Sequence, residues 1–278
     1  MTMGASDFEY IQELVRKRSA IVLEAGKEYL VESRLSTVAR TEGFTSIDHL
    51  VAELRRSPGN GLHRKVIEAM ATNETAFFRD VHPFEALRVQ LIPELMQRRQ
   101  IQRQLTIWCA ACSSGQEPYT IAMLLREHFP ALAGWQVRIL GTDLSSEVLD
   151  RAKTGRYNQA EVNRGLPAAL LVKYFRKRNV EWQVVEEIRS MVEFVELNLN
   201  EAWSKVPLCD LVLMRNVLIY FDVETKRAVL AKLRRVLRPD GYLLLGAAET
   251  TMNLDDAYHR DVVAKTGSYF RLRPQEGK

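Results

Sequence analysis

The chain has 278 residues, of which 46% are hydrophobic and 27% charged, and its formal net charge is +4. This composition is typical of an ordinary globular protein with one large domain, or a large and a small one. No apolar run approaches the ~18 residues that span a bilayer, and no basic-then-apolar leader is visible, so we expect a cytoplasmic protein without direct membrane insertion. The basic residues are interleaved with acidic ones, which argues against a nucleic acid partner.

The three cysteines are too few for a disulfide framework, which agrees with a reducing compartment. Cys109 and Cys112 have the spacing of a redox or zinc motif. However, Cys109 falls in an apolar run that reads as a buried strand, and no second such pair or histidine pair accompanies them. We therefore interpret them as structural thiols and predict no metal site.

Residues 1–72 are predicted to form a small helical domain, because apolar residues recur there at helical spacing. The first helix contains Phe8 and Ile11; the others are expected at Tyr29–Thr41, Ser46–Arg55 and Leu62–Ala71. Ser46 is a candidate N-cap, Gly43 a helix stop, and residues 57–61 a loop. Three basic side chains, Lys27, Arg34 and Arg40, mark the second helix as either solvated surface or a contact for an acidic partner.

A helix from Pro83 to the Arg98–Arg99 region precedes the most informative stretch, residues 105–123. Leu105–Cys109 predicts a buried parallel strand, and small residues then lead to Gly115 and a helix. Ser114 and Glu117 have capping-box spacing, and Pro118 suits a first helical turn. Such a turn lets a nucleotide-type ligand approach the backbone at a helix N-terminus, although only one residue of a strict GxGxxG is glycine. An ordinary strand-to-helix turn remains the alternative.

Strands and helices then alternate, which predicts a parallel α/β sheet. Strands are expected at Gln136–Gly141, Val192–Leu197, Leu208–Met214, Tyr242–Leu245 and Ser268–Leu272, and helices at Ser145–Lys153, closed by Gly155, and Val223–Leu237. Residues 238–241 are predicted to form a turn. Residues 156–191 break the alternation, with a helix at Pro167–Phe175 and an exposed strand at Glu181–Ile188, so we predict a small insertion there.

Polar side chains follow the ends of three of these strands. Asp143 is placed to accept the two hydroxyls of a ribose, and Asn198 to read the edge of an adenine. Arg215 and Asn216 follow the next strand, at a position where the residues of such a sheet contact the reacting molecules. Because the carboxyl ends of parallel strands meet at one edge, these residues predict a single ligand site.

The motifs around these positions resemble those of the chemotaxis receptor glutamate O-methyltransferase (CheR-type) family over residues 7–273. They are TNETAFFRD (72–80), SSGQEPYTIAM (113–123), TDLSSEVLDRAKTGRY (142–157), LNL (197–199), RNVLIYF (215–221) and LRPDGYLLLG (237–246). The first and the RNVLIYF motif are specific to the family, whereas the small-residue turn and Asp143 occur in many methyltransferases.

The resemblance implies a Rossmann-like class I methyltransferase sheet at 73–278, a helical receptor-contacting domain at 1–72 and a small antiparallel β insertion at 156–191. It implies methyl transfer from S-adenosylmethionine to glutamate side chains in the methylation region of the chemoreceptor cytoplasmic domain, with S-adenosylhomocysteine as product. Cofactor contacts are implied for Asn73, Thr75, Arg79, Glu117, Asp143, Asn198, Leu199, Arg215 and Asn216, to which the turn residue Gly115 is added.

For the substrate carboxylate, the resemblance implies Arg79 and Tyr220, and for the receptor surface Lys27, Arg34 and Arg40. Ser36 and Thr37 stand where other members often carry further basic residues. In some members of the family the insertion that corresponds to residues 156–191 also binds a peptide from the C-terminal tail of the receptor. Here the link after Phe175 is short, residues 176–182 contain no glycine, and the bulky Trp182 lies next to the link, so we predict that no tail peptide is bound.

Three alternatives are weaker. A methyltransferase for RNA or a small molecule disagrees with RNVLIYF, because base methylases often place an acidic or Asn-Pro-Pro sequence after the fourth strand. An adaptor without activity would be expected to lack Arg79, Tyr220 or Asp143, and all three are present. A nicotinamide oxidoreductase would require a complete glycine fingerprint.

Overall fold

The computed structural model describes residues 3–57, 59, 61–263 and 266–274. The outermost ends of the two predicted domains, residues 1–2 and 275–278, lie outside the described residues. So do Pro58 and Asn60 of the predicted loop.

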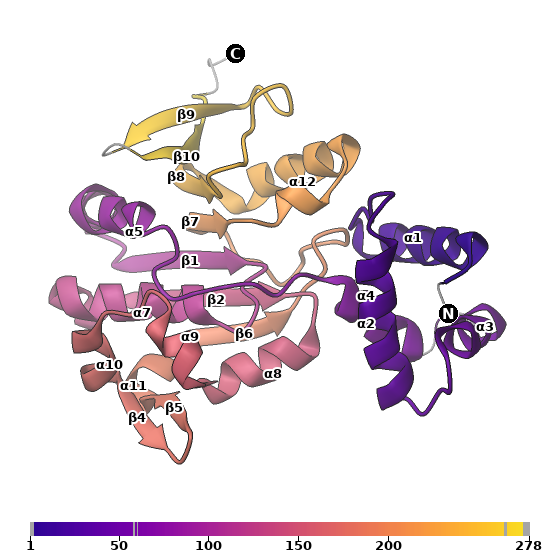
Figure 1. Cartoon of the computed structure of the whole chain (residues 1–278). Coiled ribbons are helices and arrows are strands. Elements are labelled where there is room, and N and C mark those ends of the chain that lie inside the picture. Colours follow the sequence, from indigo (N-terminus) through magenta and orange to yellow (C-terminus); the bar gives the residue numbers. More distant parts are fainter. Residues whose placement is uncertain (1–2, 58, 60, 264–265, 275–278) are drawn as a thin grey trace.

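Four helices form a small N-terminal bundle: α1 (Ala5–Ser19), α2 (Glu28–Thr41), α3 (Ile47–Arg56) and α4 (Gly61–Met70). Each contributes apolar residues at helical spacing to one separate core, among them Ile11, Leu35, Leu54 and Val66. As predicted, the Ser46 hydroxyl caps α3 by accepting a 3.2 Å hydrogen bond from the His49 N–H. In Figure 1 this bundle lies beside the carboxyl ends of the parallel strands.

The central sheet has the strand order β6-β2-β1-β7-β8-β10-β9. Its strands are β1 (Gln104–Ala110), β2 (Gln136–Asp143), β6 (Val192–Glu196), β7 (Cys209–Met214), β8 (Leu237–Leu245), β9 (Tyr258–Val263) and β10 (Thr266–Leu272). The five strands from β6 to β8 are parallel, and β10 is antiparallel to both of its neighbours. The chain order reverses between β1 and β7, which is where ligands bind in open α/β sheets.

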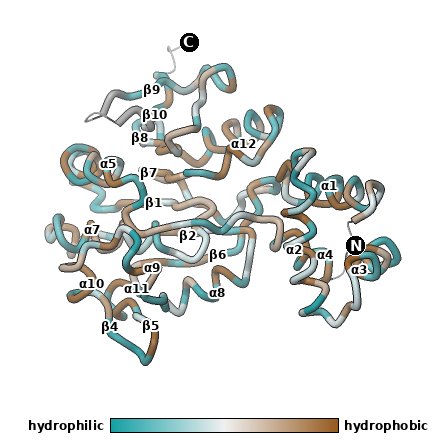
Figure 2. The backbone as a smooth tube through the Cα atoms, viewed as in Figure 1, coloured by the Kyte–Doolittle hydropathy of each residue, from teal (hydrophilic) through white to brown (hydrophobic). Residues whose placement is uncertain are grey.

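Helices cover both faces of the sheet (Figure 1): α5 (His82–Ala86), a π-helical turn (Leu87–Leu91), α6 (Ile92–Arg98), α7 (Gln116–His128), α8 (Ser146–Thr154) and α12 (Val223–Val236). Strand β1 is buried on both faces: Ile107 and Cys109 enter the core with α7, whereas Trp108 and Ala110 enter the core with α12. That double burial is why its sequence is a continuous apolar run. Figure 2 shows hydrophobic segments concentrated in the central strands.

The insertion contains β3 (Arg156–Tyr157), α9 (Gln159–Asn163), α10 (Ala168–Tyr174), β4 (Phe175–Arg178), β5 (Glu181–Val184) and α11 (Glu186–Arg189). Its strands form a small antiparallel sheet in the order β3-β5-β4. The prediction of a strand to Ile188 was wrong beyond Val184. Val184 and Ile188 are both buried, and the single turn of α11 lets both join the main core.

Two other local predictions were wrong, and one strand was missed. Residues 238–241 are not a turn, because β8 already starts at Leu237. The pairing of β7 with β8 is irregular here: Cys209 pairs with Leu237 and Leu211 with Tyr242, so the extra residues of β8 lie between these two pairs. Strand β9 was missed, since its polar sequence pairs through the backbone at the sheet edge. Helix α7 is not capped by Ser114: its N-cap is Gly115, in the left-handed region at φ 90°, and the Ser114 hydroxyl donates to the Gln116 side chain instead.

Candidate active site

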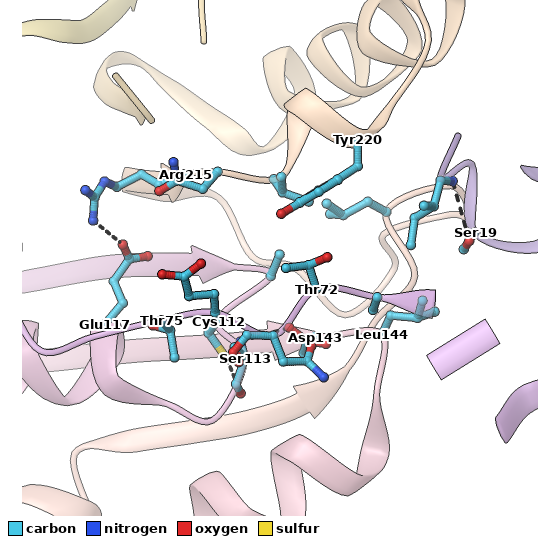
Figure 3. A pocket seen from close by; sticks show the side chains of 18 of the residues that line it. Ser19, Thr72, Thr75, Cys112, Ser113, Glu117, Asp143, Leu144, Arg215 and Tyr220 are labelled. Atoms are coloured by element: carbon cyan, nitrogen blue, oxygen red, sulfur yellow. Dashed lines mark hydrogen bonds and ion pairs between the residues drawn. The ribbon is translucent and has the colours of Figure 1, made fainter. Parts of the chain in front are cut away.

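A cleft with an empty volume of about 920 Å³ lies between the helical bundle and the carboxyl ends of the strands. It is lined by the end of α1 and the next residues, by the segment that links the bundle to the sheet, and by the loops after β1, β2, β6 and β7. Figure 3 shows side chains from the end of α1, from the linking segment and from the ends of β1, β2 and β7 around this cleft. Ten of the residues named from the sequence line it: Asn73, Thr75, Arg79, Glu117, Asp143, Asn198, Leu199, Arg215, Asn216 and Tyr220.

Gly115 is not among the residues that line the cleft, and its contact with the cofactor stays a prediction. A Cβ added there would lie 2.9 Å from the Ala152 Cβ and 3.1 Å from the Phe194 ring. Gly115 is therefore required for the left-handed turn and for close packing of α7 against α8 and β6.

Asp143, the last residue of β2, is only 6% exposed. Its carboxylate accepts hydrogen bonds from the backbone N–H groups of Ser113, at 2.8 Å, and Ser145, at 3.0 Å. Burial raises the pKa of this carboxyl group, and the backbone donors oppose that effect. Since each carboxylate oxygen accepts more than one hydrogen bond, Asp143 keeps acceptor capacity for hydroxyl groups in the cleft.

Arg215, whose side chain is buried, forms an ion-pair network with Glu117 and the half-exposed Asp80 beside the cleft. Its guanidinium donates to Glu117 at 2.9 Å, to Asp80 at 2.6 Å and to the Arg79 carbonyl at 3.0 Å. Burial raises the pKa of Glu117, against the opposing charge of Arg215. Arg215 therefore fixes the Glu117 carboxylate, which can accept hydrogen bonds from an ammonium group (Figure 3).

The loop after β7 provides the other polar groups. Asn216 has a left-handed backbone at φ 56°, and its side-chain Oδ1 is buried without a hydrogen-bond partner within the described structure. The adjoining 3-10 turn, Leu218–Tyr220, directs the Tyr220 phenol into the cleft (Figure 3).

The sequence reasoning missed Glu249, whose carboxylate binds the backbone of this loop. It follows the end of β8, so the strand-end rule that singled out Asp143 would have found it.

Asn198 already uses its side chain within the protein. Its amide donates to the Arg18 carbonyl at 2.7 Å and to Glu201 at 3.2 Å, and its oxygen accepts from the Asn200 N–H at 2.9 Å. These bonds attach the loop after β6 to the end of α1. Contact of this amide with an adenine edge stays a prediction.

The three basic residues predicted to contact the receptor differ in their surroundings: Arg34 and Arg40 lie in α2, and Lys27 is its N-cap. Lys27 is exposed and forms a 2.5 Å ion pair with Glu24, and Arg40 is exposed in the last turn of α2. Arg34 instead donates to the Met70 carbonyl, at 2.5 Å, and to the Thr72 hydroxyl, at 3.1 Å. Arg34 thus connects α2 by hydrogen bonds to the end of α4 and to the segment that links the bundle to the sheet.

The cysteines 109, 112 and 209 are free and buried, and burial raises the pKa of each thiol. In the part of the chain that the structure describes, no group of three or more His, Cys, Asp or Glu is placed to hold a metal ion. Within the same residues, no helix is long and apolar enough to cross a membrane.

The cleft residues fit S-adenosylmethionine. Asp143 offers acceptors for ribose hydroxyls, and Glu117 together with the unpartnered Oδ1 of Asn216 offers acceptors for an ammonium group. Among the residues that the structure describes, the Nε of Arg215 has no hydrogen-bond partner, and it is a buried donor in the same region. A parallel sheet that ends in an antiparallel strand, with these groups at its switch point, defines an S-adenosylmethionine-dependent methyltransferase of class I.

The chain belongs to the CheR methyltransferase family. Residues 73–265 match the family model of the CheR methyltransferase, SAM binding domain, and residues 6–71 match that of the CheR methyltransferase, all-alpha domain. Chemotaxis protein methyltransferase 1 of Pseudomonas aeruginosa is 42% identical over 98% of this chain and 100% of its own length. Chemotaxis protein methyltransferase Cher2 of Pseudomonas putida is 40% identical over 93% of this chain and 95% of its own length.

Proposed function

We propose that this methyltransferase transfers the methyl group of S-adenosylmethionine to glutamate side chains in the cytoplasmic methylation region of bacterial chemoreceptors. The products are glutamyl methyl esters and S-adenosylhomocysteine. The observation that carries the proposal is that Arg79 and Tyr220, which suit a carboxylate, line the same cleft as Asp143 and Glu117, which suit the cofactor. The names of the relatives support a role in chemotaxis.

In this proposal Asp143 holds the ribose, and Glu117, fixed by Arg215, holds the amino group of the methionine part. Asn73, Thr75, Leu199 and Asn216 complete the walls of the cofactor pocket. The bound cofactor supplies an electrophilic methyl group on a positively charged sulfur. The residues of the chain bind, orient and shield the reactants.

The substrate glutamate needs no strong general base, because a carboxyl group with a pKa of about 4.3 is already ionised at neutral pH. Arg79 and Tyr220 would orient the carboxylate by charge-assisted hydrogen bonds and leave its other oxygen free to accept the methyl group. The guanidinium of Arg79 is itself held by a 2.9 Å hydrogen bond to the Glu74 carbonyl. Positioning of this kind can contribute several kcal/mol to catalysis, and the helical bundle over the cleft excludes water.

For receptor contact we propose the basic surface of α2, with Lys27 and Arg40 facing an acidic receptor surface and Arg34 chiefly holding α2 in place.

A tail peptide is not part of the proposal. Strands β4 and β5 are joined by only Asn179 and Val180, and Lys177 lies over the Trp182 ring at 5.9 Å. Titration with the C-terminal peptides of the host's receptors tests this point, and micromolar binding to any of them would contradict it.

The central experiment incubates the protein with a receptor cytoplasmic fragment and S-adenosylmethionine carrying a radiolabelled methyl group. We expect the label to appear on the receptor as a base-labile ester.

Tyr220→Phe should lower turnover much more than cofactor affinity, since only the phenol hydroxyl is removed. Tyr258→Phe is the matched control, because it removes a buried hydroxyl that donates to the Leu230 carbonyl away from the cleft. Label that resists base, or normal turnover by Tyr220→Phe, would refute the proposed chemistry.

A further inference from the structure

Glu249 binds the backbone of the loop after β7 with both of its carboxylate oxygens. Oε2 accepts hydrogen bonds from the N–H groups of Asn216, at 2.8 Å, and Gly246, at 2.7 Å. Oε1 accepts from the N–H groups of Val217, at 2.9 Å, and Ile219, at 3.3 Å. The residue is only 9% exposed, so these four donors are satisfied by one charged side chain inside the protein.

The backbone of this loop has the form of an anion-binding nest. Asn216 is left-handed, at φ 56°, and Val217 is not, at φ −126°, so their N–H groups converge on one side. A non-glycine residue in the left-handed region is held there by its surroundings. The Glu249 carboxylate supplies the negative charge that makes this conformation favourable. Without it, three N–H groups of the loop would lose their acceptor, each at a cost in free energy.

The absence of a side chain at Gly246 allows the Glu249 carboxylate to approach the backbone of the loop after β7 closely. A Cβ at this position would lie 2.7 Å from Oε2 of Glu249 and 2.9 Å from the backbone N of Asn216. The ends of β7 and β8, which are adjacent parallel strands, therefore meet through Gly246 and Glu249. This contact determines where the loop leaves the sheet, and with it the direction of the following 3-10 turn that carries Tyr220.

We infer that Glu249 is a positioning residue for methyl transfer. It does not line the cleft but holds the loop that presents the Asn216 amide and the Tyr220 phenol to it. The inference concerning Tyr220 rests on the proposed function. The inference concerning Asn216 requires only that the cleft binds S-adenosylhomocysteine.

The test compares Glu249→Gln and Glu249→Asp with the wild-type full chain. Glutamine keeps the length but replaces one acceptor oxygen with an NH₂ group that faces backbone donors, so kcat should fall about tenfold to a hundredfold. Calorimetry should show S-adenosylhomocysteine binding about three- to tenfold more weakly, the effect of about one hydrogen bond. Aspartate keeps both acceptors on a shorter stem and should retain activity between that of Glu249→Gln and wild type.

A double-mutant cycle with Tyr220→Phe separates positioning from a general loss of stability. If Glu249 acts through the placement of the phenol, the kcat of the double variant should be close to that of the more impaired single variant. Asp210→Asn is the structural control: it changes a buried carboxylate at the opposite end of β7 that accepts from the Thr106 N–H, and it should alter stability but not kcat per folded molecule.

Two outcomes would overturn the inference: wild-type kcat and affinity in folded Glu249→Gln, or losses that multiply in the double variant. If the wild-type protein does not methylate receptor fragments, the proposed function fails instead. The calorimetric comparison then tests Glu249 alone, and unchanged S-adenosylhomocysteine affinity in Glu249→Gln would refute its role.

Discussion

The backbone N–H of Val22 donates a 2.8 Å hydrogen bond to the carbonyl oxygen of Tyr220. The neighbouring residues Ile21 and Phe221 form an antiparallel bridge, and Arg16 forms a 2.8 Å ion pair with Asp222. The segment that follows α1 is thus paired directly with the loop that carries the proposed substrate-orienting phenol. The helical bundle therefore supports the active-site loop as well as covering the cleft.

Val22→Pro should impair methyl transfer, because proline has no N–H to donate to Tyr220. We expect a stability loss of about 0.5–1.5 kcal/mol and a larger fall in kcat than in S-adenosylhomocysteine affinity. Val22 is 38% exposed, so the substitution does not disrupt a core. Val22→Ala, which keeps the N–H, is the control. Equal effects of the two variants on kcat would show that the hydrogen bond is unimportant.

Asp143→Ala should weaken binding of S-adenosylhomocysteine by ~1–3 kcal/mol, since ribose hydroxyls would lose their acceptors. The N–H groups of Ser113 and Ser145 would lose theirs as well, so the thermal midpoint should also fall. Calorimetry measures the first effect and thermal unfolding the second. Asp150→Ala on α8, whose carboxylate is 73% exposed and paired with Lys153, should change neither appreciably. Unchanged affinity in Asp143→Ala would remove this residue from the cofactor site.

Charge reversal at two arginines of α2 should have different consequences. Arg40→Glu should lower receptor methylation and leave cofactor binding intact, because Arg40 is exposed in the last turn. Arg34→Glu should in addition lower stability, since its bonds to Met70 and Thr72 are lost. Added salt should reduce methylation by the wild-type enzyme, as exposed charges are screened over ~10 Å at 0.1 M ionic strength. If Arg40→Glu weakens cofactor binding as strongly as methylation, the proposed receptor surface is wrong.

Stability should fall on mild acidification because of His63 in α4. Burial of the imidazole, and next the charge of Arg18, lower its pKa from the ordinary value of 6.5. The unfolded chain then binds the proton at a higher pH than the folded one, so the free energy of unfolding decreases as the pH falls below about 6.5. Urea unfolding at pH 7.5 and 5.5 measures the difference.

His63→Gln should reduce this pH dependence. An identical pH dependence in wild type and His63→Gln would show that another group is responsible.

Local patterns in the sequence determined much of this protein. The apolar run of β1, the Ser46 cap and the polar residues at the end of β2 and after β7 are each determined within a few residues of chain, by burial, capping and strand direction. The rule that parallel strands end at one edge then places Asp143, Arg215 and Asn216 together without knowledge of the sheet order.

Only the tertiary structure decided how these side chains are held. Arg215 meets Glu117 across 98 positions of sequence, Asn198 uses its amide on Arg18 across 180, and Glu249 reaches Asn216 across 33. Gly115 likewise packs closely against Ala152 and Phe194. No periodicity encodes such pairings, because they depend on which strands become neighbours and on how closely their ends pack. Residue type can nominate a site, but the partners that orient its groups are settled by the packing of the whole sheet.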